Sequence, residues 1–284
     1  MSRGRLASLA MAALASIAAS LIATGLGSAG AAQSSASGVE ELQIPLNPLP
    51  FDLHGYLRRP NGAGPFPGVV LVPACSRLGS SADQGWGETL SSWGYVTLTL
   101  DIFTAHDIPG QTTCLYSARP ELAGDAYRGL DLLIERKLVD ARRVLIVGFG
   151  RGGSLAFAAV GRDGPVRNAK HKFRAAVAFY PPCGDVKGIM TVPTLVMVGA
   201  RERTLDSCRK MAAGEDDMGI SRQPDAGAPI QFIVLPDAYA GFDMPALQKP
   251  VDVLGLHFEY SKAATEEAKE VLRQFLKTIA EQAQ

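Results

Sequence analysis

The stretch Val147–Ser154 reads Val-Gly-Phe-Gly-Arg-Gly-Gly-Ser and has the glycine spacing of a catalytic turn between a strand and a helix. In the G-x-S-x-G pattern, a strained turn exposes a serine or cysteine nucleophile at the start of the helix. Here the nucleophile position is Gly150, which tolerates such a backbone but carries no attacking atom. Ser154 is the nearest hydroxyl, and because it lies about one helical turn further on, we expect it to face away.

Two other interpretations of these glycines stay open. A phosphate-binding loop also begins a helix, but no G-x-G-x-x-G phase fits and no Gly-Lys-Ser/Thr follows. A tight turn that serves only close helix–sheet packing fits the same residues without any chemistry.

The partners of a nucleophile would come from two later strand ends. Glu202 lies three residues after Gly199, where a catalytic acid is expected, although pairing with Arg201 or Arg203 as a surface acid explains it equally well. The base position after the late strand is Ala240, and no histidine occurs between residues 235 and 243. Only the acid of a nucleophile–acid–base set is therefore present.

An oxyanion hole would need backbone N–H groups beside the turn. The residue after the nucleophile position, Arg151, supplies one in this pattern, and the loop after an earlier strand supplies the other. In that loop Pro73 has no N–H to donate, whereas Cys75 and Ser76 do.

The elements around these positions alternate between buried strands and helices. Continuous apolar runs predict buried strands, and apolar residues at helical spacing predict helices. This order predicts βαβ units, a mostly parallel sheet with helices on both faces, and a site at the carboxyl ends of the strands. The predicted strands are 39–46, 53–59, 68–72, 95–100, 144–147, 175–180, 193–198 and 230–235, and the predicted helices are 125–137, 154–160 and a last one capped by Ser261.

The N-terminus resembles a secretory signal peptide. Arg3 and Arg5 precede an alanine-rich apolar stretch to about Leu26, and small residues follow at 29–32. An uncleaved membrane anchor is the alternative, because the stretch approaches the length of a span. We expect a signal peptide at 1–31, a linker at 32–38, one domain at 39–284, and an exported protein, periplasmic or secreted, without membrane attachment after cleavage.

Composition and charge limit the partners and cofactors that we expect for this protein. The 28 basic residues balance 28 acidic ones, and no basic run suggests a nucleic-acid partner. The four cysteines suggest two disulfides in an exported chain, with three pairings open. Without Cys-x-x-Cys spacing, and with four scattered histidines, a metal site is not expected.

Several segments together resemble the dienelactone hydrolase family, and within it the exported, cysteine-containing branch. They are Phe66–Leu71, Trp93–Asp101, Asp125–Tyr127, Phe173–Pro181 and Tyr239–Asp243, within a similarity that runs from Val39 to the C-terminus. The resemblance implies the α/β-hydrolase fold, a three-layer sandwich, and hydrolysis of lactones or carboxylic esters by Cys or Ser, Asp and His without a cofactor.

By position, the resemblance places the nucleophile at Gly150, the acid at Glu202 and the base at Ala240. Pro73-Ala74 stands where the family usually has His-Gly. Similar proteins imply the disulfides Cys75–Cys114 and Cys183–Cys208.

The missing nucleophile and base determine the hydrolytic rate that we expect. Loss of nucleophile or base costs a serine hydrolase roughly a millionfold in turnover, and this chain lacks both. We therefore expect a protein that binds a small ester, lactone or aromatic ligand, or a protein partner, without conventional acyl transfer. One alternative is an enzyme with relocated catalytic groups, for which His106 and His257 are the candidates. Another is family-level hydrolysis through Ser154, through Ser76, or through Glu202 and a water. The oligomeric state is left open.

Overall fold

The computed structural model describes residues 38–46, 50–75, 78–106, 119–184, 186, 189–215 and 226–282. The predicted signal peptide and nearly all of the predicted linker lie outside these residues. Within the described part of the chain, no helix combines the length and the apolar character needed to cross a membrane.

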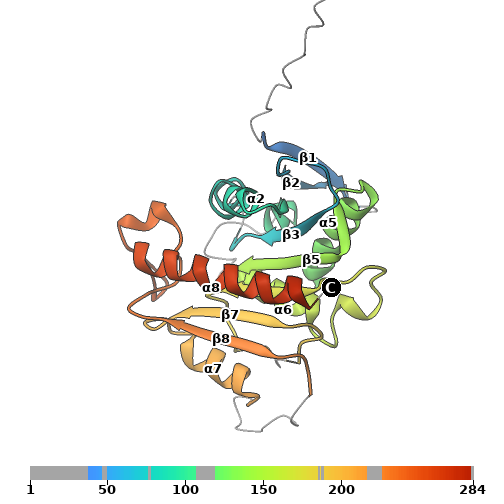
Figure 1. Ribbon diagram of the computed structural model, residues 1–284. Helices are drawn as coiled ribbons and strands as arrows, with labels where there is room; N and C mark the ends of the chain where they lie inside the picture. Colours follow the sequence, from blue (N-terminus) through green and yellow to red (C-terminus); the bar gives the residue numbers. More distant parts are fainter. Residues whose placement is uncertain are drawn as a thin grey trace, which may run out of the picture. The chain divides into compact units, whose positions relative to one another are not determined.

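An eight-stranded sheet forms the centre of the domain (Figure 1). Its order is β1-β2-β4-β3-β5-β6-β7-β8. The pairs β1–β2 and β2–β4 are antiparallel, and every pair from β4–β3 to β7–β8 is parallel. The strands are β1 Glu40–Pro45, β2 Asp52–Arg58, β3 Phe66–Val72, β4 Val96–Leu100, β5 Val139–Phe149, β6 Ala175–Phe179, β7 Thr194–Gly199 and β8 Ile230–Leu235. Each predicted strand is present, and β5 extends beyond its apolar run.

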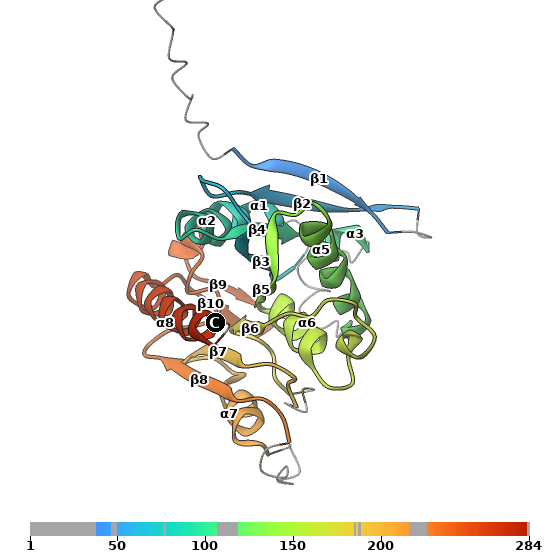
Figure 2. The ribbon, with the colours of Figure 1, turned by 45° about the vertical axis from the view of Figure 1, so that its right-hand side comes forward.

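Helices cover both faces of this sheet (Figure 2). One face packs against α5 (Ala123–Glu135), α6 (Arg151–Val160) and α7 (Leu205–Ala213). The other packs against the segment 79–92 and α8 (Lys262–Glu281). Because both faces are covered, the central strands are continuously apolar rather than alternating. The predicted three-layer α/β-hydrolase architecture is confirmed.

The helix boundaries explain two local features. Ser261 caps α8, as predicted, because its hydroxyl oxygen accepts a hydrogen bond from the Ala264 N–H at 3.3 Å. Helix α6 begins at Arg151, three residues before the predicted start, because Gly150 is its N-cap. The shorter elements are α3 Ile102–Ala105, the 3₁₀ turns η2 Pro120–Leu122, η3 Pro165–Arg167 and η4 Pro245–Gln248, and the hairpin β9 Val251–Val253 with β10 Leu256–Phe258.

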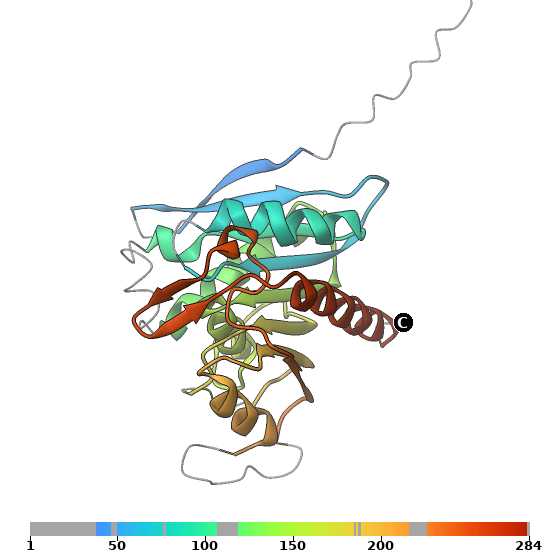
Figure 3. The same ribbon diagram turned by 90° about the vertical axis from the view of Figure 1, so that its left-hand side faces the viewer.

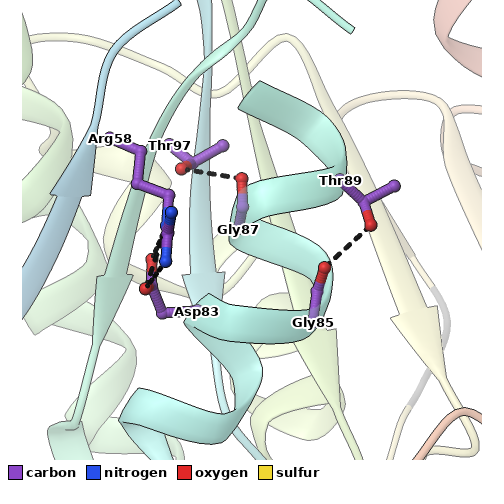
Figure 4. A network of polar contacts seen from close by, with 6 residues as sticks. All are labelled: Arg58, Asp83, Gly85, Gly87, Thr89 and Thr97. Atoms are coloured by element: carbon purple, nitrogen blue, oxygen red, sulfur yellow. Dashed lines mark hydrogen bonds and ion pairs between the residues drawn. The ribbon is translucent and has the colours of Figure 1, made fainter. Parts of the chain in front are cut away.

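The segment after β3 contains a π-helical turn that the sequence did not predict. Helix α1 (Gly79–Ala82) runs through the π-helix η1 (Asp83–Gly87) into α2 (Glu88–Ser92). Figure 4 shows how η1 is anchored: the Arg58 guanidinium donates to both carboxylate oxygens of Asp83, and the Thr97 hydroxyl donates to the Gly87 carbonyl. The pair is buried, so its hydrogen bonds offset the desolvation of both charges. This anchor holds η1 against β2 and β4.

A disulfide joins Cys183 to Cys208 and ties the segment after β6 to α7. It is one of the two pairings that the family resemblance implied. Cys75 is also disulfide-bonded, but Cys114, its expected partner, lies outside the described residues, so that pairing stays a prediction.

Candidate active site

The turn between β5 and α6 has the backbone of a nucleophile elbow. Gly150 adopts φ 50° and ψ −117°, a conformation that side chains disfavour. A Cβ at Gly148 would lie 2.1 Å from the Gly152 carbonyl oxygen, and one at Gly152 would lie 2.0 Å from the Val72 carbonyl oxygen. These two glycines are therefore required for the turn to close against the sheet.

A side chain at Gly150 would be a tight fit, but its closest contact would be with another side chain rather than with the backbone. The nearest atom to a Cβ there is the Ala74 Cβ at 3.2 Å, followed by Tyr180 Cε2 at 3.7 Å. The closest neighbours of such a Cβ are thus side-chain atoms, and Gly150 itself carries no reactive atom. The turn between β5 and α6 thus ends at a residue without a side chain.

A cavity of about 300 Å³ opens beside this turn. Five positions identified from the sequence line it: Gly150, Glu202, Ala240, Cys75 and Arg151. They come together because the parallel strands β3, β5, β7 and β8 all end at this edge of the sheet. Most of the remaining wall is apolar, from Leu78, Met244, Leu247, Val251, Val253, Leu256 and Phe258. Ser76 lies outside the described residues.

Part of the wall belongs to the hairpin β9–β10. Figure 3 shows this orange-red pair of short strands on the opposite side of the view from the C-terminal end of α8. Its residues from Val251 to Phe258 border the cavity, while Leu254 at the tip is exposed. The hairpin therefore encloses the cavity on the side away from the sheet.

Glu202 is half-buried and held by its own loop. Its Oε1 accepts a hydrogen bond from the Gly199 N–H at 2.6 Å, and its Oε2 accepts one from the Thr204 hydroxyl at 3.1 Å. The pKa of Glu202 is raised to about 7, mainly by burial and also by the nearby Asp243, although the two hydrogen-bond donors act in the opposite direction. A carboxyl with this pKa can hold or release a proton near neutral pH.

The arginines beside Glu202 are engaged elsewhere. Arg201 forms an ion pair with Asp237 at 2.7 Å, and Arg203 donates to the Gly255 carbonyl at 3.2 Å. The interpretation of Glu202 as a surface acid paired with either arginine is therefore wrong.

Two further acidic groups at this edge were missed by the sequence analysis. Tyr180 directly follows β6 with φ 38°, lines the cavity, and packs edge-on against Phe242 at 5.3 Å between ring centroids. Its hydroxyl lies beside the Asp243 carboxyl. Asp243 Oδ2 accepts a hydrogen bond from Trp86 Nε1 at 2.6 Å. Tyr180 lies at the end of a predicted strand, and Asp243 lies in the segment that was expected to hold the base position.

Burial is the main cause of the pKa shifts of Tyr180 and Asp243. It raises the pKa of Tyr180 well above its usual value, and Asp243 adds to the shift. It also raises the pKa of Asp243, against the effect of the hydrogen bond from Trp86. Tyr180 is thus a neutral phenol at ordinary pH, and of the two carboxyl groups it is Glu202 that lines the cavity.

The sequence model of the dienelactone hydrolase family matches residues 53–280. The chain belongs to the dienelactone hydrolase family. No curated protein sequence matches it, but several solved structures share its fold.

The similar structures are about equally distant in sequence. A dienelactone hydrolase crystal structure from Klebsiella pneumoniae has 18% identity and a TM-score of 0.61, over 85% of this chain and 99% of that one. A dienelactone hydrolase-like promiscuous phosphotriesterase from metagenomic libraries has 18% identity and a TM-score of 0.64, over 86% and 99%. The dienelactone hydrolase from Anabaena variabilis has 17% identity and a TM-score of 0.55, over 85% and 98%.

The other candidate residues named from the sequence, Ser154 and His106, contact other parts of the structure. The Ser154 hydroxyl donates to the Pro182 carbonyl at 3.2 Å and borders a second cavity of about 510 Å³. His106 pairs with Asp125 at 2.6 Å and does not line the 300 Å³ cavity. Neither residue stands at the family's catalytic turn.

His257 does line the 300 Å³ cavity, from β10. Its Nδ1 lies 2.9 Å from Asp252 and its Nε2 3.2 Å from Glu259, and these carboxylates raise its pKa. Both ring nitrogens are therefore occupied by acceptors that favour the imidazolium form, which is a poor arrangement for a base. Across the described ranges, no cluster of three or more His, Cys, Asp or Glu residues could hold a metal ion.

Proposed function

We propose that this member of the dienelactone hydrolase family binds a small ester, lactone or aromatic ligand in the 300 Å³ cavity without cleaving it. The observation that carries the proposal is the elbow itself. Gly148 and Gly152 keep the turn closed, and Gly150 leaves its tip without a nucleophile. With Ala240 at the base position, the two groups that form and resolve an acyl-enzyme are both missing.

The arrangement of the other candidates supports this proposal over a relocated mechanism. Ser154 faces the second cavity, and His257 is held between two carboxylates. A relocated nucleophile would need a base within hydrogen-bond reach. Neither Ser154 nor any serine in the described ranges has a hydrogen bond to His257.

Direct assay of the mature wild-type protein tests the proposal. We expect no enzymatic turnover of short p-nitrophenyl esters or of a lactone, and no covalent labelling of a serine by a fluorophosphonate. Ligand binding is followed in parallel by thermal shift, because a bound ligand raises the melting temperature. Turnover that disappears in Ser154→Ala or His257→Ala would establish the relocated mechanism instead.

We propose also that the protein is exported. The charged and then apolar start of the chain supports export, and so does the Cys183–Cys208 disulfide, since disulfides persist mainly in oxidising compartments. Mass spectrometry of the protein recovered from the periplasm or the medium should give an N-terminus near residue 32. Full-length protein retained in the membrane fraction would contradict this expectation.

A further inference from the structure

One carboxyl, that of Glu202, lines the cavity, and it forms no ion pair among the described residues. Tyr180 also lines the cavity, and Asp243 lies directly behind Tyr180. Neither Glu202 nor Asp243 forms a salt bridge with a cation among the residues that the structure describes. Asp243 Oδ1 is buried and has no hydrogen bond of ordinary geometry there.

The cationic side chains that border the cavity are directed to other partners. Arg201 pairs with Asp237, Arg203 reaches the hairpin carbonyl of Gly255, and His257 pairs with Asp252 and Glu259. Arg201, Arg203 and His257 are therefore held by partners other than Glu202, whose own hydrogen bonds come from the neutral donors Gly199 and Thr204.

A buried carboxylate is unstable unless it is paired. An ammonium group that reached Glu202 would supply the missing charge and would donate charge-assisted hydrogen bonds. The same group could lie over the Tyr180 ring, whose face attracts cations. The apolar wall from Met244, Leu247 and the hairpin would then cover the rest of such a ligand.

We propose that the cavity binds a small primary amine with an apolar body, whose ammonium group donates to the Glu202 carboxylate beside the Tyr180 ring. This inference rests on the proposed function, since it names the ligand class that the same cavity takes without cleavage. A volume of about 300 Å³ is at the lower end for small-molecule pockets, and a phenyl ring on a short chain fits that size.

Three probes with one body and different head groups test the charge preference. They are phenethylamine (cationic), phenethyl alcohol (neutral) and phenylacetate (anionic), titrated into the mature protein by calorimetry. We expect phenethylamine to bind at least about tenfold more tightly than phenylacetate. Glu202→Gln should weaken amine binding by about tenfold and change alcohol binding little, which also reports that the variant is folded. Glu266→Gln, an exposed change of the same type on α8, is the control.

The pH dependence gives an independent readout. Because the pKa of Glu202 is about 7, its carboxylate population grows from about pH 6 to about pH 8, while an alkylammonium stays protonated. Amine affinity should therefore rise with pH in the wild type. Asp243 and Tyr180 are its acidic neighbours; His257 also titrates at the cavity, and the slope that remains in Glu202→Gln belongs to these groups.

The outcomes separate the two proposals. Tighter binding of phenylacetate, or equal loss of amine and alcohol binding in Glu202→Gln, would overturn the amine proposal and leave the binding function standing. Failure of all three probes to bind at millimolar concentration would also overturn the amine proposal, whereas the binding function fails only if the esters and the lactone give no thermal shift either.

Discussion

The double variant Gly150→Ser/Ala240→His should hydrolyse p-nitrophenyl acetate at least about a hundredfold faster than the wild-type chain. The serine would stand at the tip of the elbow, where the nearest atom to its Cβ is 3.2 Å away. The histidine would stand on the same cavity and activate it. The gain should stay well below the roughly millionfold effect of a complete nucleophile and base, because Pro73 supplies no N–H to the oxyanion loop.

The two single variants are the controls for this gain. Gly150→Ser alone has no base, and Ala240→His alone has no nucleophile, so each should remain at the wild-type rate in a stopped or continuous nitrophenolate assay. A folded double variant that stays silent would show that position 240 does not place an imidazole at the elbow, and the assignment of Ala240 to the base position would be abandoned.

Gly152→Ala should destabilise the protein by more than about 4 kcal/mol in urea unfolding, which is a large part of a typical domain's stability. Its Cβ would lie 2.0 Å from the Val72 carbonyl oxygen and 2.5 Å from that of Pro73. Both are backbone atoms of the central sheet and its outgoing loop, so the clash cannot be relieved by rotating a side chain.

Gly150→Ala is the matched comparison two residues earlier. It meets only the Ala74 side chain at 3.2 Å, so its effect comes from the backbone conformation and should be about 1–3 kcal/mol. Equal destabilisation by the two substitutions would contradict the view that Gly152 closes the turn while Gly150 only occupies its tip.

The sheet could be predicted because its central strands are buried on both faces. Apolar runs such as Gly68–Val72 and Thr194–Val198 have no other stable place in a domain of this size, and their order along the chain implied the parallel connections. The elbow could be predicted for a related reason: a glycine cluster between a buried strand and a helix has few structural uses.

The properties of Tyr180 and Asp243 could not be predicted, because they come from contacts between distant segments. Asp243 meets Trp86, which is 157 residues away in sequence and is presented by the π-helical turn η1. Neither the π-helix nor the positive φ of Tyr180 has a local sequence signal, since both depend on what packs around them. The hairpin β9–β10 is short and half-exposed, and so it lacked a clear apolar pattern.

The backbone at Gly150 also bears on how such a chain can change over evolutionary time. A residue with a Cβ at φ 50° and ψ −117° carries a strain of about 1–3 kcal/mol, which an active enzyme tolerates in return for reactivity. Glycine relieves that strain. A serine placed at position 150 would take on this strain, so it would lower the stability of the fold before any activity could offset the cost. Glycine is therefore the residue that stability alone favours at position 150.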